Sequence, residues 1–419
     1  MSGPHGGDHL ADGVGSRSAA AAVDLPAAPR RSLDIGVFGA RAIPSTYSGY
    51  ETFLTTLLPA LVDRGHHVTM YCRTTEVDDG TPYRGVKRVV LPAIAGKQLN
   101  TLSHGLVASL RSRLAGHDVV LVVNVANAPY CALNKYTGQR VVLNTDGQEW
   151  LRGKWGRAAR SYFRFAARMA RHGATALVSD CTSMADVYRR EFRADSTVIP
   201  YCFPTDGSAA PTEAPERLGV VRGDYFIIAG RLNPENNIDV VAEAYSRSEL
   251  SQPLLVLGTA NYSSPVAQTL ERLTTSDRRI RLVGHVDDRS EFLDLVGSAT
   301  CYVHGHSVGG MNPSLVEAMH AGALTVALDT PFNRETLGSA GLFFRTGADG
   351  ETNVVDVLRD GCEMPLSDAK ALRDMAAERV AELYNVEDVV AAYEALLLTS
   401  TERSSRSAVV LPTKWSTSP

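Results

Sequence analysis

Short runs of β-branched and aliphatic residues alternate with longer stretches of helical periodicity along almost the whole chain. This alternation predicts an α/β fold in which helices cover both faces of parallel sheets. The predicted strands of the first half are residues 35–38, 68–72, 86–91, 119–123, 141–144, 176–178 and 197–200. Those of the second half are residues 226–229, 254–257, 280–283, 301–303, 325–328 and 342–344, and two helices at 366–384 and 387–398 follow them.

A stretch with little apolar periodicity divides this pattern into two halves. Residues 203–222 are rich in Pro, Thr, Ser, Gly and Ala, which predicts an interdomain linker. The linker separates a Rossmann-like domain at 32–202 from a second one at 223–398, and residues 1–31 and 399–419 are predicted to be disordered tails. Because such domains bind ligands at the carboxyl ends of their strands, we expect a shared cleft between them.

The composition restricts the class of protein. The chain has 419 residues, of which 44% are apolar and 21% charged, as in a soluble globular protein of two domains. Its six cysteines form no Cys-x-x-Cys pair, which favours reduced thiols in a cytoplasmic protein over a disulfide framework. No apolar run reaches the roughly 18 to 20 residues of a membrane span, and the N-terminus lacks the apolar centre of a signal peptide.

The most specific chemistry lies between the predicted strands at 301–303 and 325–328. A glycine-rich loop at 307–312 precedes a helix that begins at Pro313, and glycine lets a backbone approach a ligand closely. The N–H groups of the first helical turn form an anion site, and Glu317, one turn later, can accept hydrogen bonds from sugar hydroxyls. These residues fit a nucleotide-sugar site, and equally an ordinary strand–loop–helix with a solvated Glu317.

Polar groups also follow three other predicted strands. The loop at 39–49 precedes an amphipathic helix at 50–64 and can close over a sugar or a phosphate. Asp146 either points into the cleft or caps an Asp-Gly turn. Arg231 either holds a pyrophosphate with its planar guanidinium group or forms a surface salt bridge.

With these residues the chain resembles the retaining GT-B glycosyltransferases of family 4, in which two glutamates eight residues apart flank the glycine-rich loop. Glu317 matches the second glutamate, and Gly309 stands at the position of the first. Residues 304–314 and 331–335 resemble, more narrowly, the rhamnosyltransferase-like subgroup, which shares that departure. The resemblance extends over residues 34 to about 398 and implies a GT-B fold, with two Rossmann-like domains and a cleft between them.

The resemblance also implies roles for individual residues, with the acceptor on the N-terminal domain and the nucleotide-sugar donor on the C-terminal domain. Asp146 stands where many members have a histidine, and Asn236 stands where they have a lysine. Arg231 and the helix at Pro313 would bind the donor diphosphate, and Glu317 would hold the ribose hydroxyls. The implied donor-binding residues are Arg231, Asn236, His306, Gly309, Gly310, Asn312, Pro313, Ser314 and Glu317, and the implied catalytic residues are Gly49, Glu51 and Asp146.

The subgroup implies dTDP-rhamnose as the donor substrate, with no cofactor, and a lipid-linked or growing saccharide as the acceptor in envelope or capsular polysaccharide synthesis. A catalytically silent GT-B sugar-nucleotide-binding or partner protein remains an alternative, which Gly309 and Asn236 favour. A sugar-nucleotide 2-epimerase is a further alternative. No Asp-x-Asp signature lies in a suitable place, and His304 and His306 lie two residues apart, so we expect no metal site.

An arginine-rich segment between Arg152 and Gly173 contains no acidic residue. Its 3-4-4-3 arginine spacing predicts one stripe on a helix. The stripe either contacts an anionic membrane surface on the cytoplasmic side, where each cation contributes about 1 kcal/mol, or forms a solvated face. The negative net charge of the chain, −4, argues against a nucleic-acid partner. The five arginines are Arg157, Arg160, Arg164, Arg168 and Arg171.

Overall fold

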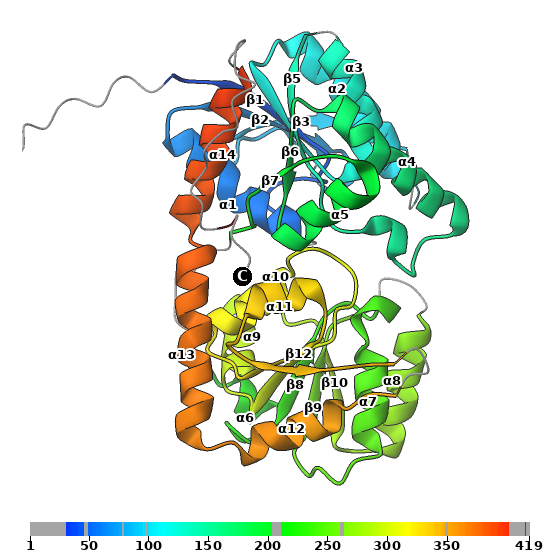
Figure 1. The fold of residues 1–419 in the computed structure, drawn as a ribbon, viewed down its shortest axis with the longest axis vertical. Coiled ribbons are helices and arrows are strands. Elements are labelled where there is room, and N and C mark those ends of the chain that lie inside the picture. Colours follow the sequence, from blue (N-terminus) through cyan, green and yellow to red (C-terminus); the bar gives the residue numbers. More distant parts are fainter. Residues whose placement is uncertain are drawn as a thin grey trace, which may run out of the picture. The chain divides into compact units, whose positions relative to one another are not determined.

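Two parallel β-sheets, each packed against helices, make up the fold of the computed structural model (Figure 1). The structure describes residues 31–45, 49–77, 79–94, 96, 99–136, 138–202, 211–259, 264–347, 351–401 and Trp415. Residues 32–419 form one compact unit, and both sheets belong to it.

The first sheet has seven strands in the order β3-β2-β1-β4-β5-β6-β7, and all neighbouring strands are parallel. Every residue of β4 is buried, so both faces of the sheet are covered, because successive strand residues point to opposite faces. The strands are β1 (Asp34–Phe38), β2 (His67–Arg73), β3 (Lys87–Leu91), β4 (Val119–Val123), β5 (Arg140–Asn144), β6 (Ala176–Ser179) and β7 (Thr197–Val198).

The second sheet has six parallel strands in the order β10-β9-β8-β11-β12-β13. Its four central strands are fully buried, and the core on each face is separate. The strands are β8 (Phe226–Ala229), β9 (Leu254–Leu257), β10 (Ile280–Gly284), β11 (Cys301–His304), β12 (Thr325–Leu328) and β13 (Leu342–Phe344).

The helices connect the strands of both sheets. The apolar face predicted for the first helix is confirmed, since Phe53, Leu54, Leu57, Leu58 and Leu61 are all fully buried. The helices of the first half are α1 (Gly49–Asp63), α2 (Leu99–Ala115), α3 (Ala128–Tyr136), α4 (Arg157–Gly173) and α5 (Thr182–Phe192), with short turns η1 (Val125–Asn127) and η2 (Glu149–Leu151). Those of the second half are α6 (Ala214–Arg217), η3 (Pro234–Asn236), α7 (Ile238–Ser246), α8 (Pro265–Ser276), α9 (Arg289–Gly297), α10 (Pro313–His320), α11 (Pro331–Leu337), α12 (Val354–Glu363), α13 (Leu366–Leu383) and α14 (Val386–Thr401).

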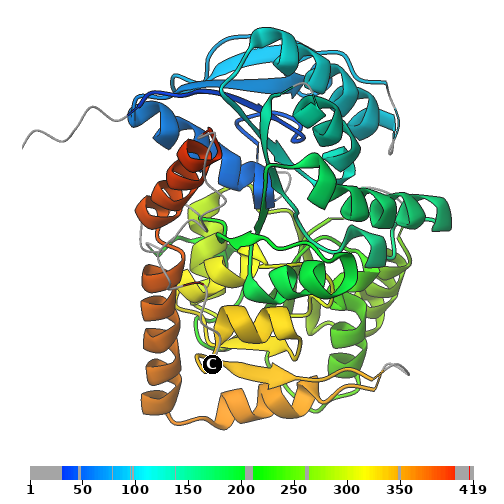
Figure 2. The ribbon, with the colours of Figure 1, turned by 45° about the horizontal axis from the view of Figure 1, so that its top comes forward.

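The last two helices run along one side of both sheets (Figures 1 and 2). Helix α14 packs on α1 and β5 of the first half. Its Tyr393 hydroxyl accepts a hydrogen bond from Asn144 Nδ2 at 2.8 Å, and its Glu394 lies 2.7 Å from Arg64 Nη1 and 3.1 Å from His66 Nε2. Helix α13 packs on α10 of the second half, so the C-terminal helices tie the two halves together.

The predicted linker and tails differ from the structure in part. Residues 203–210 of the linker and residues 1–30 of the N-terminal tail lie outside the described residues. Within the rest of the linker, α6 forms and Thr212 donates two hydrogen bonds to Asp294, so this segment packs on the second half. Helix α14 continues past Thr399, and Trp415 is buried with its Nε1 donating to Leu383 O at 2.8 Å.

Candidate active site

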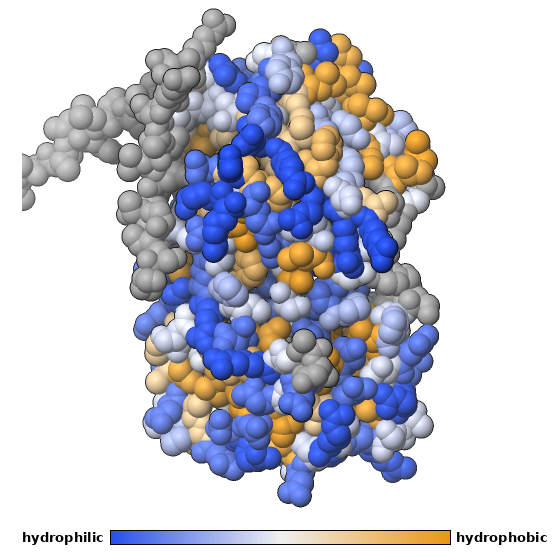
Figure 3. All heavy atoms as spheres, turned by 45° about the vertical axis from the view of Figure 1, so that its right-hand side comes forward, coloured by the Kyte–Doolittle hydropathy of each residue, from blue (hydrophilic) through white to orange (hydrophobic). Residues whose placement is uncertain are grey.

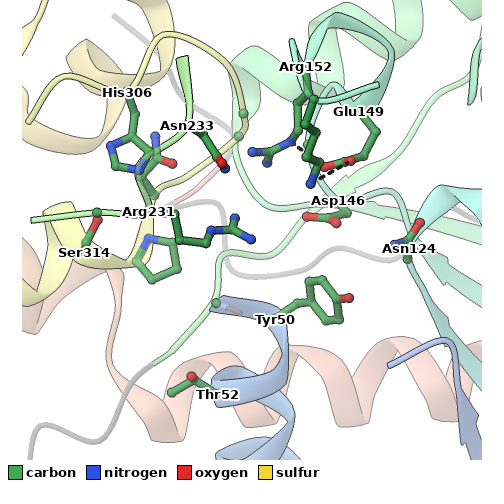
Figure 4. Close-up of a pocket in the computed structure, with 18 of the residues that line it drawn as sticks. Tyr50, Thr52, Asn124, Asp146, Glu149, Arg152, Arg231, Asn233, His306 and Ser314 are labelled. Atoms are coloured by element: carbon green, nitrogen blue, oxygen red, sulfur yellow. Dashed lines mark ion pairs between the residues drawn. The ribbon is translucent and has the colours of Figure 1, made fainter. Parts of the chain in front are cut away.

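A cavity of about 1000 Å³ lies between the carboxyl ends of the two sheets (Figure 4). Its lining residues follow β1, β2, β4, β5 and β6 of the first sheet and β8, β9, β10 and β11 of the second. Parallel α/β sheets bind ligands at these ends, because there the loops from several strands converge. The predicted cleft is therefore present, and both halves contribute to it.

Arg231 projects into the cavity from the loop after β8 (Figure 4). It is partly buried, and among the described residues it forms no ion pair. Asn236 is different, because it is only 3% exposed and does not line the cavity. Its Nδ2 donates to Arg231 O at 2.7 Å, so the structure shows Asn236 holding the loop that carries Arg231 rather than facing a ligand.

The glycine-rich loop and the first turn of α10 form another part of the wall. Gly309, Gly310, Asn312, Pro313 and Ser314 all line the cavity, so the N-terminal N–H groups of α10 lie at its edge. Gly309 has a φ of +149°, a conformation that disfavours any side chain. Family-4 members have a glutamate at the position of Gly309. That glutamate is therefore incompatible with the backbone seen here.

Glu317 also lines the cavity, one turn into α10. It is partly buried, and its carboxylate forms an ion pair with Arg289 of α9. One carboxylate oxygen carries that pair, and the other remains able to accept hydrogen bonds from a ligand hydroxyl.

The glycine-rich loop is packed tightly against the first half. A Cβ at Gly310 would lie 2.1 Å from Asp180 Oδ2, and Met311 N donates to that same oxygen at 3.0 Å. A Cβ at Gly147 would lie 3.1 Å from Gly309 Cα. Side chains are therefore excluded at these glycines by the approach of the two halves, in addition to any requirement of a ligand.

Two carboxyl groups of the first half face the cavity at this contact. Asp146, which follows β5, has a φ of +54°, and its N–H donates to Asn144 Oδ1 at 3.0 Å. Burial and, secondarily, the charge of Glu149 raise the pKa of Asp146. Asp180, which follows β6, is buried, and burial together with the charge of Asp146 raises its pKa to about 7. Asp180 can therefore carry a proton near neutral pH, and the pKa of Asp146 is shifted in the same direction.

Two cations from the turn after β5 line the same cavity. Arg152 forms an ion pair with Glu149, and its Nη1 lies 3.7 Å from Glu235 Oε1 of the second half. Lys154 Nζ lies 3.6 Å from Glu149 Oε2. Although burial raises the pKa of Glu149, these two cations outweigh it and the pKa is lowered. The first half thus contributes positive charge to the cleft. Asn236 of the second half, which stands where family members have a lysine, contributes none.

Helix α4 has a cavity face and a solvent face. Trp155, just before the helix, and Tyr162 line the cavity, and Trp155 Nε1 donates to Glu149 Oε2 at 2.7 Å. On the other face the arginine stripe lies as its spacing predicts. Arg157, Arg164, Arg168 and Arg171 are exposed, Arg160 is half-buried, and Arg164 pairs with Glu191 at 3.2 Å.

The loop after β1 places its predicted residues differently. Gly49 lines the cavity, and a Cβ there would lie 2.2 Å from Pro313 Cγ at the start of α10. Glu51 is fully buried and does not line the cavity. Its carboxylate accepts hydrogen bonds from Arg41 N at 3.0 Å and Ser45 Oγ at 2.9 Å. Glu51 therefore holds the loop and has no direct route to a ligand.

His306 lines the cavity and stacks on His304 with ring centroids 4.4 Å apart (Figure 4). Burial lowers the pKa of both imidazoles, that of His304 to about 3, so both rings are neutral at pH 7. Within the described ranges, no group of three or more His, Cys, Asp or Glu side chains is placed to hold a metal ion. In the same part of the chain, no helix combines the length and the hydropathy that crossing a membrane requires.

The sequence of each half matches a protein-family model, and the fold of the whole chain resembles that of solved structures. Residues 47–206 match the family model described as Glycosyltransferase Family 4, and residues 223–360 match the one described as Glycosyl transferases group 1. No curated protein sequence matches the chain.

Several solved structures share the arrangement of both halves. Sucrose-phosphate synthase from Thermosynechococcus elongatus is 16% identical with a TM-score of 0.72, over 88% of this chain and 98% of that one. Anabaena HepE in complex with UDP-glucose is 14% identical with a TM-score of 0.69, over 88% of this chain and 100% of that one. Trehalose-6-phosphate synthase OtsA is 10% identical with a TM-score of 0.69, over 88% and 99%. These likenesses confirm the predicted α/β fold of GT-B type.

Proposed function

We propose that this chain, a GT-B glycosyltransferase by its two matched domains and its fold, transfers a sugar with retention from a nucleotide sugar to a saccharide acceptor. The observation that carries the proposal is the convergence of Arg231, the N-terminus of α10 and Glu317 on one cavity. A guanidinium group and the N-terminus of a helix suit a diphosphate, and a carboxylate suits ribose hydroxyls. The similar HepE structures hold UDP or UDP-glucose, which supports a nucleotide-sugar donor.

The donor diphosphate is the leaving group in this proposal. Arg231 and the first turn of α10 bind it, and Arg152 and Lys154 add positive charge from the opposite wall. Preformed charges of this kind stabilise the negative charge that develops on a leaving group, and they do so without reorganisation. We therefore assign neutralisation of the diphosphate to these protein groups.

The proposed reaction breaks the bond between the anomeric carbon and the phosphate oxygen, and forms one from that carbon to the acceptor oxygen. The acceptor hydroxyl attacks on the face that the diphosphate leaves, and its proton passes to a donor phosphate oxygen. Asp146 lines the cavity and is suited to form a hydrogen bond with a sugar hydroxyl, and so to position one of the two sugars. Gly49 gives the acceptor side of the cavity its close approach to Pro313.

We further propose dTDP-rhamnose as donor and a lipid-linked or growing saccharide as acceptor, in envelope or capsular polysaccharide synthesis. The loop at 304–314 and residues 331–335, which resemble the rhamnosyltransferase-like subgroup, support the donor. The base and the sugar are tested by a panel of nucleotide sugars.

A thermal-shift screen against UDP-, GDP- and dTDP-sugars tests the donor site. The matching nucleotide sugar raises the melting temperature by a few degrees at about 100-fold Kd, because it binds only the native cleft. Glu317→Ala loses this shift, whereas Arg289→Ala keeps it, since that variant removes the ion pair and leaves Glu317 in place. The assignment of the donor site is wrong if no nucleotide sugar raises the melting temperature of the wild type, or if Glu317→Ala keeps the full shift.

The surface beside α4 supports an acceptor at a membrane. Helix α2 exposes Leu99, Leu106, Leu110 and Leu114, and α3 packs between α2 and α4, which carries the arginine stripe. The face that Figure 3 turns forward accordingly shows hydrophobic areas beside a hydrophilic band over its upper half. Apolar side chains next to cations are the pattern of a protein surface that lies on anionic lipid.

Co-sedimentation with vesicles that contain anionic lipid tests this surface. Replacing Arg157, Arg164, Arg168 and Arg171 by Gln lowers the affinity for the vesicles by about 10²- to 10³-fold, at about 1 kcal/mol for each cation. The control replaces the exposed Arg189 and Arg190 of α5 and leaves binding unchanged. Equal binding by both variants contradicts the assignment of the membrane surface.

A further inference from the structure

Arg73 is a buried cation that lines the cavity at the end of β2, and no carboxylate in the described part of the chain forms an ion pair with it. Its side chain is 4% exposed, and its Nε is buried without a hydrogen-bond partner. Nη2 donates to Thr101 Oγ1 at 3.3 Å. Among the residues that the structure describes, Arg73 enters no ion pair.

A buried charge without an ion pair destabilises the folded protein when no ligand is bound. Proteins pair buried charges, because removing a charge from water without a counter-charge costs several kcal/mol. Burial lowers the pKa of Arg73, yet a guanidinium group stays protonated at neutral pH. The nearby carboxylate of Glu51 is used elsewhere, on Arg41 N and Ser45 Oγ. Glu51 and Glu76 are close enough to raise the pKa of Arg73, but neither forms an ion pair with it among the described residues. A counter-charge in direct contact with Arg73 is therefore expected from a ligand.

A second guanidinium group lies beside it. Arg73 N donates to Arg41 O at 2.7 Å, so the two residues are held together at the ends of adjacent strands. Arg41 also lines the cavity, and its side chain is 3.4 Å from the partly exposed Glu76. Hydroxyl groups of Ser45 and Thr101 line the same part of the wall. The Ser45 hydroxyl already donates to Glu51, whereas the Thr101 hydroxyl only accepts from Arg73 in the contacts seen here. Two guanidinium groups with one hydroxyl donor beside them are the chemistry that binds a phosphate group.

The strand order separates this group from the donor site. Gly147 and Asp180, which lie against the glycine-rich loop of the donor half, follow β5 and β6. Arg73 ends β2, three strands away from β5 in the order β2-β1-β4-β5. At about 4.8 Å between strands, the two positions are roughly 14 Å apart along the sheet. That separation is about the length of a saccharide unit or more, which suits the far end of an acceptor better than the donor diphosphate.

We propose that Arg73, together with Arg41, binds a phosphate group of the acceptor, so that the acceptor is a phosphorylated saccharide. The phosphate belongs either to a soluble sugar phosphate or to a saccharide joined to a lipid through phosphate. This inference rests on the proposed glycosyltransferase function, and it specifies the class of acceptor.

Calorimetric titration of inorganic phosphate into the protein saturated with UDP tests the site, because UDP occupies the donor phosphate positions. The wild type binds phosphate, Arg73→Gln weakens it at least tenfold, and Arg73→Lys, which keeps the charge, lies between them. Arg113→Gln, an exposed arginine of α2, serves as the matched control and binds as the wild type does. Circular dichroism melting curves show whether Arg73→Gln folds, and the lysine variant carries the test if it does not.

Acceptor kinetics provide the second readout. With a phosphorylated acceptor, Arg73→Gln raises the acceptor KM at least tenfold and leaves the donor KM unchanged. Transfer to soluble sugar phosphates identifies the soluble source, and transfer only to polyprenyl-phosphate-linked sugar in vesicles identifies the lipid source. The proposal is overturned if phosphate binds equally to wild type and Arg73→Gln, or if neutral and phosphorylated acceptors are used equally by both proteins. Phosphate binding measured without UDP separates the two claims: Arg73-dependent binding in a protein that does not bind UDP contradicts only the donor site.

Discussion

Arg231→Gln lowers the kcat of glycosyl transfer by about 10²- to 10³-fold, the loss typical of removing one preformed group that stabilises developing charge. Arg231 projects into the cavity and forms no ion pair among the described residues, so its charge is available to the leaving diphosphate. The variant also leaves the melting temperature of the free protein nearly unchanged, because the guanidinium group forms no ion pair among the described residues that the substitution would remove. Initial rates with the donor identified by the screen measure this effect.

Arg272→Gln is the matched control for this variant. Arg272 is an exposed arginine of α8 that pairs with Glu243 and does not line the cavity. Its rate stays within a factor of two of the wild type. A rate for Arg231→Gln within threefold of the wild type would show that the diphosphate is bound by other groups.

Gly310→Ala weakens donor binding at least tenfold and destabilises the protein by about 1–3 kcal/mol, as overpacking of a closed interior does. The new Cβ would lie 2.1 Å from Asp180 Oδ2, so the loop must move away from the first half. That movement breaks the hydrogen bond from Met311 N and displaces the first turn of α10, which is the proposed diphosphate site. Isothermal titration with the donor and denaturant unfolding measure the two effects.

A double variant separates steric clash from a general effect of the substitution. Asp180→Ala removes the carboxylate that the Cβ meets, so Gly310→Ala costs much less in the Asp180→Ala background than in the wild type. Gly156→Ala is the control, because a Cβ there meets no atom within 4 Å. Equal costs of Gly310→Ala in both backgrounds would contradict the close contact between the two halves.

The fold could be predicted from the sequence because each buried strand is a short β-branched or aliphatic run between helical stretches. Every predicted strand is present, although the one predicted at 197–200 is limited to Thr197–Val198. The linker was predicted from composition alone, and composition does not reveal that Thr212 and Arg222 both bind Asp294. These contacts are what make residues 211–222 part of the second half.

The candidate site could be predicted most completely where one local motif carries it, although Arg231, Asp146 and Gly49, each predicted from another loop, also line the cavity. Gly309, Gly310, Pro313 and Glu317 lie in one loop and helix, and the structure brings them all to the cavity. Asp180 and Arg152 were missed because their roles depend on contacts with the opposite half, more than 80 residues away in sequence. A usable signal was present for Asp180, which directly follows a buried strand as Asp146 does.

Spacing was misleading for residues that turn away from the cavity. Asn236 and Glu51 were assigned to the site because of their positions in a motif or beside a loop. Both are buried, and their side chains bond to the backbone of the loops that carry Arg231 and Arg41. Their positions in the sequence therefore predicted correctly that these residues belong to loops at the site. The direction of each side chain was set by the backbone groups of the loop that needed a hydrogen-bond partner.

The central claim, that this cleft transfers a sugar from a nucleotide donor, is tested most directly by proton NMR of the complete reaction. The donor from the thermal-shift screen is incubated with the protein and a phosphorylated saccharide, and the anomeric signals are followed in time. We expect a new glycosidic signal with the anomeric configuration of the donor. Arg231→Gln does not produce this signal. Binding of the nucleotide sugar without any transfer across the acceptor panel would contradict it, and would identify the chain as a sugar-nucleotide-binding protein without catalytic activity.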